Sequence, residues 1–318
     1  MRILVFLFGI FLSLAAMCNA QESYIVVERY SKRVLLASGT ETKRPVAGLA
    51  HMATAKVVLD WAGMAGVSNS TLLTVPAHTF YSNDLNPLGL QAGDRISLRD
   101  ALYATILTED AVSPLTLAQH VGMDLLRRRP QSGSPMDVFI AEMNHLSRSL
   151  GMDRTRYYSP SGADVWKNNT FSTASDIAKL SVTLTTHSAY TFYAKQKQRT
   201  LKVIRTDGRE SQVTVLNTNK LLNSSLKVEG LKVGLSQIAG QCSSVMANHD
   251  SYIETLPDGT QRVTPVQLVV VVLGSSNAEG FSKALIGQGW KQYEVWRHGG
   301  YMSSPGRKEF LKLPEATR

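Results

Sequence analysis

The chain has 318 residues, of which 43% are hydrophobic and 19% are charged, and its formal net charge is +9. This balance is ordinary for a protein with a buried core, so it excludes wholesale disorder, and the glycines and prolines show no collagen-like period. The 2 cysteines are too few for a disulfide framework or a structural zinc cluster.

The first twenty residues have the anatomy of a cleaved secretory signal. Arg2 supplies a positive charge, residues 3–17 form an uncharged apolar stretch, and Ala20 is a small residue at the cleavage site. That stretch is short for a transmembrane helix, and no later stretch is apolar enough over sufficient length to span a bilayer. Lipidation at Cys18 is the alternative, but Met17 is large where a lipoprotein signal has a small residue. We therefore expect cleavage after Ala20 and export to the periplasm or cell envelope of a bacterium.

Export determines which partners suit the charge of the chain. Cleavage removes Arg2 and no acidic residue, so the net charge falls by one from +9 to about +8. A basic exported protein suits a polyanionic surrounding such as a cell wall or membrane surface, or simply has a well-solvated surface. Nucleic acid is not an expected partner, because no basic-aromatic pattern or binding motif is present. Cys242 would be the single cysteine left in an oxidising compartment, so we expect a buried, unreactive thiol.

The remaining sequence divides into strands near both ends and helices in the middle. Residues 23–38 predict a β-hairpin, and residues 47–65 predict a helix with one apolar face. Residues 66–96 are mostly loop, with short strands at 72–75 and near Phe80. Further helices are expected at 98–107, 113–128, 136–150, 173–186 and 281–296, and further hairpins at 199–217 and at 241–254 with 262–274.

This order of elements predicts an α/β fold of the α+β kind. The N- and C-terminal strands should form one antiparallel sheet, flanked by helices and by a helical lobe. Neither a repeat nor a Pro-rich linker interrupts the chain. We therefore expect one domain over residues 21–300, followed by a polar tail at 301–318.

Four segments resemble the D-alanyl-D-alanine carboxypeptidases, in the same order and at similar spacing. They are residues 39–61, 90–122, 150–179 and 217–242, and the likeness extends from about residue 24 to residue 298. These proteins are low-molecular-weight penicillin-binding proteins that share the fold of the serine β-lactamases. The resemblance implies that fold, and a cleft built from the motifs S-x-x-K, S-x-N and K-T-G.

Each family motif supplies a chemical group. In the first, a serine at a helix start lies one turn from a lysine that takes its proton. The second links a proton relay to a substrate amide, and the third presents a cation and a hydroxyl on an edge strand to hold the substrate carboxylate. Backbone N–H groups at the nucleophile and on that strand form the oxyanion hole.

This chain departs from the first and third motifs. Gly48 stands at the nucleophile position and His51 at the position of the base, so no acyl-enzyme can form at residue 48. The third motif reads Lys232-Val233-Gly234, which keeps the cation and the glycine but loses the hydroxyl. The resemblance implies that Lys232 and Gly234 keep a substrate-binding role, and that serine at 48 with lysine at 51 would restore some acylation.

The second motif falls at residues 108–111, and two alignments of it are open. Without a gap, Glu109 and Ala111 take the positions of the serine and the asparagine. A shift by one residue places Thr108 and Asp110 there instead. Neither alignment restores the motif, so Glu109 is the third catalytic position that we interpret as substituted.

Two other stretches come close to the first motif, and one loop resembles the family's cleft edge. Residues 224–227 spell S-x-x-K and residues 40–43 nearly do, but neither lies at a helix start, so we interpret both as chance. Asp164 and Trp166 resemble the loop that borders the cleft in the family. A structural role explains them adequately.

A histidine paired with a carboxylate could instead activate water without a covalent intermediate. In the family geometry His51 would converge with Glu109 or Asp110, opposite Lys232. We favour the simpler interpretation, in which His51 fills the floor of the cleft. No H-E-x-x-H motif occurs and the 7 histidines are dispersed, so we expect no metal and no other cofactor.

Three functions fit these residues. The leading hypothesis is an exported, penicillin-binding-protein-like domain that no longer hydrolyses peptides and binds a peptidoglycan stem peptide or a cell-envelope protein. The second is a serine-type D-alanyl-D-alanine carboxypeptidase that remains active in peptidoglycan metabolism through unorthodox residues. The third is an envelope scaffold that does not use the cleft. A labelled β-lactam separates the first two, because covalent capture requires a nucleophile.

Overall fold

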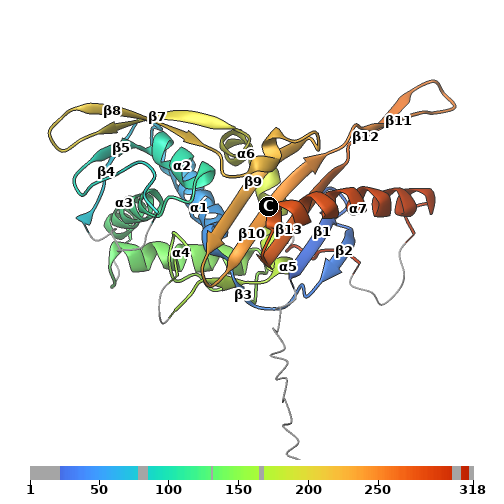
Figure 1. The fold of residues 1–318 in the computed structure, drawn as a ribbon, viewed down its shortest axis with the longest axis horizontal. Helices are drawn as coiled ribbons and strands as arrows, with labels where there is room; N and C mark the ends of the chain where they lie inside the picture. Colours follow the sequence, from blue (N-terminus) through green and yellow to red (C-terminus); the bar gives the residue numbers. More distant parts are fainter. Residues whose placement is uncertain (1–21, 78–84, 130–131, 165–167, 303–308, 315–318) are drawn as a thin grey trace, which may run out of the picture.

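A five-stranded antiparallel sheet forms the centre of the fold (Figure 1). The computed structural model describes residues 22–77, 85–129, 132–164, 168–302 and 309–314. The strand order is β2-β1-β13-β10-β9, so N-terminal and C-terminal strands share one sheet as predicted. The strands are β1 (Ser23–Glu28), β2 (Val34–Ser38), β9 (Val228–Ser236), β10 (Gly240–Asn248) and β13 (Gln267–Ser275).

Helices cover both faces of this sheet. α7 (Ala278–His298) packs on β10 and β13, and α5 (Ala174–Thr185) packs on β13 and β1. Side chains that alternate along β13 belong to two separate apolar clusters, with Val269 and Val271 in one and Val270 and Val272 in the other. The continuous run of valines is therefore explained by a central strand that is buried on both faces.

The helical lobe lies beside the sheet (Figure 1). Ser97 and Ser134 cap two of its helices, each accepting a backbone N–H from the residue three positions later. The lobe helices are α1 (Ala50–Ala65), α2 (Leu98–Leu107), α3 (Val112–Arg128), α4 (Pro135–Ser149) and α6 (Ser188–Ala194).

Several strands depart from the expected pattern. The predicted hairpin at 199–217 exists, but it joins a second, four-stranded sheet in the order β4-β5-β7-β8, which was not predicted. In the region predicted as one hairpin at 241–254 and 262–274, β10 pairs directly with β13. The chain between these two strands forms a separate hairpin of β11 and β12, which projects from the body (Figure 1). The strands concerned are β4 (Leu72–Thr74), β5 (Arg95–Ser97), β7 (Gln198–Ile204), β8 (Glu210–Leu216), β11 (Tyr252–Thr255) and β12 (Gln261–Thr264), with β3 (Arg44–Pro45) and β6 (Phe171–Ser172) as a further two-stranded pair.

The structure describes the two ends of the chain to different extents. The predicted signal at residues 1–20 and the predicted strand near Phe80 lie outside the described residues. Part of the segment expected to be a tail contacts the domain, because the N–H of Leu311 donates to the carbonyl of Lys32 at 2.8 Å and Leu311 is buried. Of the helices that the structure describes, none combines the length and apolar character needed to cross a membrane.

Candidate functional site

A single 3-10 turn, η1 (Ala47–Leu49), places Gly48 against the edge strand β9. The turn precedes α1, so the α-helix begins at Ala50 rather than at the predicted residue 47. η1 packs so closely on β9 that a Cβ atom on Gly234 would lie 2.7 Å from the Gly48 nitrogen. Packing between these two backbones therefore requires glycine at 234.

The carboxylate of Glu109 fills the space beside Gly48. A Cβ atom at residue 48 would lie 2.4 Å from Oε2 of Glu109, which is too short for a real contact. The same oxygen accepts the backbone N–H of Leu235 at 3.2 Å, and Oε1 accepts Nζ of Lys232 at 2.6 Å. A side chain at residue 48 and the present position of the Glu109 carboxylate therefore exclude each other.

Lys232 lies on an edge strand as predicted, but its ammonium group does not face an open cleft. The side chain is fully buried, and Nζ donates to the Thr108 carbonyl at 2.8 Å as well as to Glu109. A buried charge is tolerated when it is paired and hydrogen-bonded in this way. A substrate carboxylate would have to displace Glu109 to reach it.

His51 is a buried, neutral residue on α1. It is 2% exposed, and its Nδ1 atom lies 2.9 Å from the Thr105 carbonyl oxygen. Burial lowers the pKa of His51 from 6.5 to about 3, and the charge of Lys232 adds to this effect, while the backbone of Thr105 and of Ser161 opposes it. With so low a pKa the imidazole is a weak base, which supports the interpretation that His51 fills the floor of the cleft.

This pKa predicts that acid destabilises the protein through His51. In the unfolded chain His51 binds a proton near pH 6.5, whereas in the folded chain it stays neutral down to about pH 3. Protonation of His51 therefore does not affect the free energy of unfolding above pH 6.5, and it lowers that free energy progressively as the pH falls from 6.5 toward 3. Between pH 7 and pH 5 the wild type should lose about 2 kcal/mol more unfolding free energy than His51→Gln, from about 1.4 kcal/mol per pKa unit. Urea unfolding at both pH values measures the difference. An equal loss in the two proteins would mean that the pKa of His51 is not lowered by folding.

The structure distinguishes the two alignments of the second motif. A cavity of about 250 Å³ beside Gly48 is lined by both Glu109 and Ala111, whereas Thr108 and Asp110 are absent from its lining. Thr108 lines an adjoining cavity of about 550 Å³, whose lining does not include Gly48. Asp110 instead accepts the backbone N–H of Ser113 at 2.7 Å. The geometry therefore favours the alignment without a gap.

The loop that borders the cleft is held to β9 by Asp164. Its carboxylate accepts the hydroxyl of Ser236 at 2.9 Å and the backbone N–H of Ile238 at 3.1 Å. Sequence reasoning placed Asp164 at the cleft edge but did not find these contacts, nor the N–H of Leu235 that binds Glu109. Trp166 lies outside the described residues.

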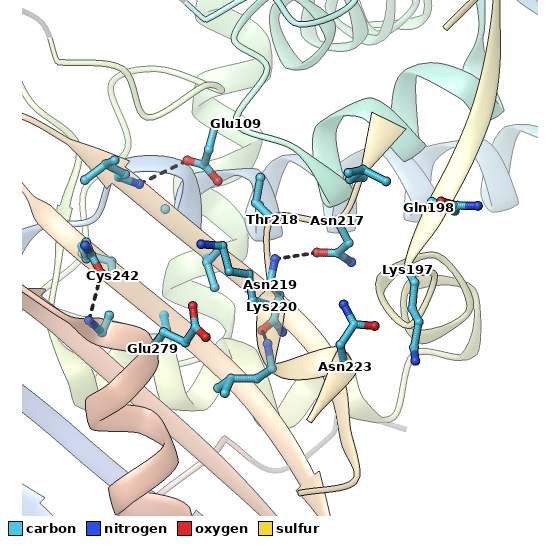
Figure 2. A pocket seen from close by; sticks show the side chains of 18 residues that line it. Glu109, Lys197, Gln198, Asn217, Thr218, Asn219, Lys220, Asn223, Cys242 and Glu279 are labelled. Atoms are coloured by element: carbon cyan, nitrogen blue, oxygen red, sulfur yellow. Dashed lines mark hydrogen bonds between the residues drawn. The ribbon is translucent and has the colours of Figure 1, made fainter. Parts of the chain in front are cut away.

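A larger cavity of about 830 Å³ is lined by Glu109 and by residues 233–235 of β9. Figure 2 shows Glu109 at its border, with Asn217 and Asn219 joined by a hydrogen bond of 2.9 Å between Asn219 N–H and Asn217 Oδ1. Lys197 lies on another part of the lining. The cleft is therefore roomy enough for a peptide, and its walls carry both amides and charges.

The remaining candidates lie away from this cleft or lack reactive groups. Lys227 of the chance motif pairs with Asp250 at 2.6 Å on the surface. Cys242 is buried as predicted, and burial raises the pKa of its thiol to about 11. In the part of the chain that the structure describes, no three His, Cys, Asp or Glu side chains gather as metal ligands would.

A helix-covered antiparallel sheet, whose edge strand meets a helix start at a cleft, is the architecture of the DD-peptidases. The crystal structure of the Streptomyces K15 DD-transpeptidase matches with a TM-score of 0.68 at 22% identity, over 84% of this chain and 96% of that chain. Penicillin-binding protein D2 of Listeria monocytogenes matches with a TM-score of 0.61, over 88% and 96%. The predicted fold is therefore confirmed.

The chain belongs to the D-alanyl-D-alanine carboxypeptidase family, because the sequence model of that family matches residues 14–253. The D-alanyl-D-alanine carboxypeptidase of Streptomyces sp. strain K15 is 25% identical over 209 residues, covering 65% of this chain and 69% of that protein. The D-alanyl-D-alanine endopeptidase of Pseudomonas aeruginosa is 24% identical over 229 residues, covering 70% and 66%. The family expected from the four segments is confirmed.

Proposed function

We propose that this chain is an exported member of its family that no longer hydrolyses peptides, and that its cleft binds a peptide of peptidoglycan or of an envelope protein. Residues 1–20 would be a cleaved signal and residues 21–300 the peptidase-like domain. The protein would then act in the periplasm or cell envelope. Lys232 and Gly234 would serve the cleft as structural elements at its floor.

The position of the Glu109 carboxylate carries this proposal. Catalysis in the family needs a nucleophile at residue 48 and N–H donors that stabilise the negative charge of the intermediate. Here residue 48 has no side chain, and the N–H of Leu235 on β9 already donates to the carboxylate at 3.2 Å. A fixed negative charge at that place would repel the developing oxyanion, so bond formation and its stabilisation are lost together.

We expect no release of D-alanine when the purified protein is incubated with diacetyl-Lys-D-Ala-D-Ala. Coupled detection of free D-alanine measures the reaction, and an active serine carboxypeptidase is the positive control. Turnover above the buffer blank that disappears in His51→Gln would support the second hypothesis, an active hydrolase in which the histidine and a carboxylate activate water.

A further inference from the structure

Three cavities meet at Glu109. Their volumes are about 830, 550 and 250 Å³, and Glu109 lines all three. Leu216 lines the first and the second, Leu235 the first and the third, and Leu85 the second and the third. Glu109 is therefore the centre of a branched groove, with a leucine between each pair of branches.

These three leucines, which we name the leucine rim, are strongly exposed. The exposed fractions are 57% for Leu85, 65% for Leu216 and 60% for Leu235. They come from three separate segments: the loop between β4 and β5, the end of β8, and β9. Scattered exposed leucines are ordinary, but several around one groove are typical of a surface that docks another polypeptide. Apolar anchors around a buried polar centre dominate the energy of such interfaces.

The charges that line the groove disfavour a peptide carboxylate. Within the described residues, Glu109 is the charged residue of the 550 Å³ branch, and Glu109 and Asp164 are those of the 250 Å³ branch. The largest branch is balanced, because it has Lys197 and Lys220 as well as Glu109 and Glu279. Lys232 pairs with Glu109 and offsets its charge, but the Lys232 side chain is fully buried and lines none of the three branches. The charged groups that the two smaller branches present to a ligand are therefore acidic, and no branch is basic.

We propose that the ligand is an internal, extended segment of a protein, which directs a lysine or arginine side chain to Glu109 and apolar side chains to the leucine rim. The inference rests on the proposed function, a peptide-binding cleft, and names its ligand. Each oxygen of Glu109 accepts one described bond, from Lys232 or from the N–H of Leu235, and keeps a lone pair for a cation. Since Glu109 holds that N–H, the backbone of a ligand cannot pair with it, and recognition at Glu109 proceeds through side chains.

Isothermal titration of the purified protein with three peptides tests this ligand. The peptides are acetyl-Ser-Leu-Lys-Leu-Ser-amide, the same peptide with glutamate in place of lysine, and diacetyl-Lys-D-Ala-D-Ala with its free carboxylate. We expect the lysine peptide to bind at least tenfold more tightly than either of the others. Raised salt should narrow the difference, because part of it is electrostatic.

Rim variants test the apolar half of the proposal. Leu216→Ser and Leu235→Ser should each weaken binding of the lysine peptide at least fivefold, whereas Ile253→Ser should change it less than twofold. Ile253 is a matched control, because it is 63% exposed on the hairpin that projects from the body (Figure 1). Equal effects of rim and control variants would overturn the inference. If the D-Ala-D-Ala peptide binds more tightly than the lysine peptide, this inference is overturned but the proposed function stands. If none of the three peptides shows saturable binding, both the inference and the proposed function are overturned.

Discussion

Replacing Glu109 with alanine is expected to lower the free energy of unfolding by about 3–5 kcal/mol. The substitution leaves the ammonium group of Lys232 fully buried, with the Thr108 carbonyl as its described partner. Removing one member of a buried pair costs far more than removing a surface pair, because the other charge stays desolvated without compensation. Urea unfolding followed by circular dichroism measures the loss.

Two further variants separate this cause from a general loss of contacts. Glu109→Ala with Lys232→Met should recover most of the stability, because no uncompensated charge remains. Glu210→Ala is the matched surface control: Glu210 pairs with Lys202 at 2.6 Å with both side chains about half exposed, and its loss should cost less than about 1 kcal/mol. Similar losses in Glu109→Ala and Glu210→Ala would contradict a stabilising role for the buried pair.

Restoring the first family motif alone should leave the protein unreactive toward β-lactams. From the sequence we expected Gly48→Ser with His51→Lys to suffice, but a side chain at 48 meets the carboxylate of Glu109. Adding Glu109→Ser removes that obstacle, frees the N–H of Leu235 and returns a hydroxyl to the second motif. We therefore expect the triple variant to be acylated by a fluorescent penicillin at a measurable rate, and the double variant to remain at the level of the wild type.

Fluorescence of the protein band on a denaturing gel reports acylation, and circular dichroism checks that each variant is folded. The control carries Gly48→Ala in place of Gly48→Ser, together with the other two changes. It has nearly the same steric demand but no hydroxyl, so it should not be labelled. Labelling of the double variant would show that Glu109 does not block the nucleophile position. Labelling of the alanine control would show that the penicillin reacts at a site other than residue 48.

The central sheet was predictable because its strands carry their own signal. β1 and β13 are rich in β-branched residues, which favour strands. The assembly of the second sheet was not predictable. A short strand was expected at 72–75, where β4 lies, but β5 has three residues, too few to show a period, and it pairs with β7 far along the chain. The short helix α6 was missed for a similar reason: its cap is His187, which is not a residue type that marks a helix start.

Motif spacing located the residues of the cleft but not the way in which their side chains pair. Glu109 and Lys232 are 123 positions apart, and nothing local to either residue indicates that they meet. Lysine is also among the residues least often buried, so composition argued against the position that Lys232 takes. The loss of the nucleophile could be read from Gly48 alone. Only the three-dimensional structure shows that the carboxylate of Glu109 occupies the space where a side chain at residue 48 would lie.

Intact mass spectrometry of the wild-type protein after incubation with benzylpenicillin tests most directly the proposal that the cleft is inactive. Covalent capture of a β-lactam needs a nucleophile at residue 48, where the chain has glycine and the carboxylate of Glu109 fills the adjacent space. We expect the mass of the unmodified chain, with no adduct even at saturating penicillin. A stoichiometric adduct that survives denaturation would contradict an inactive cleft.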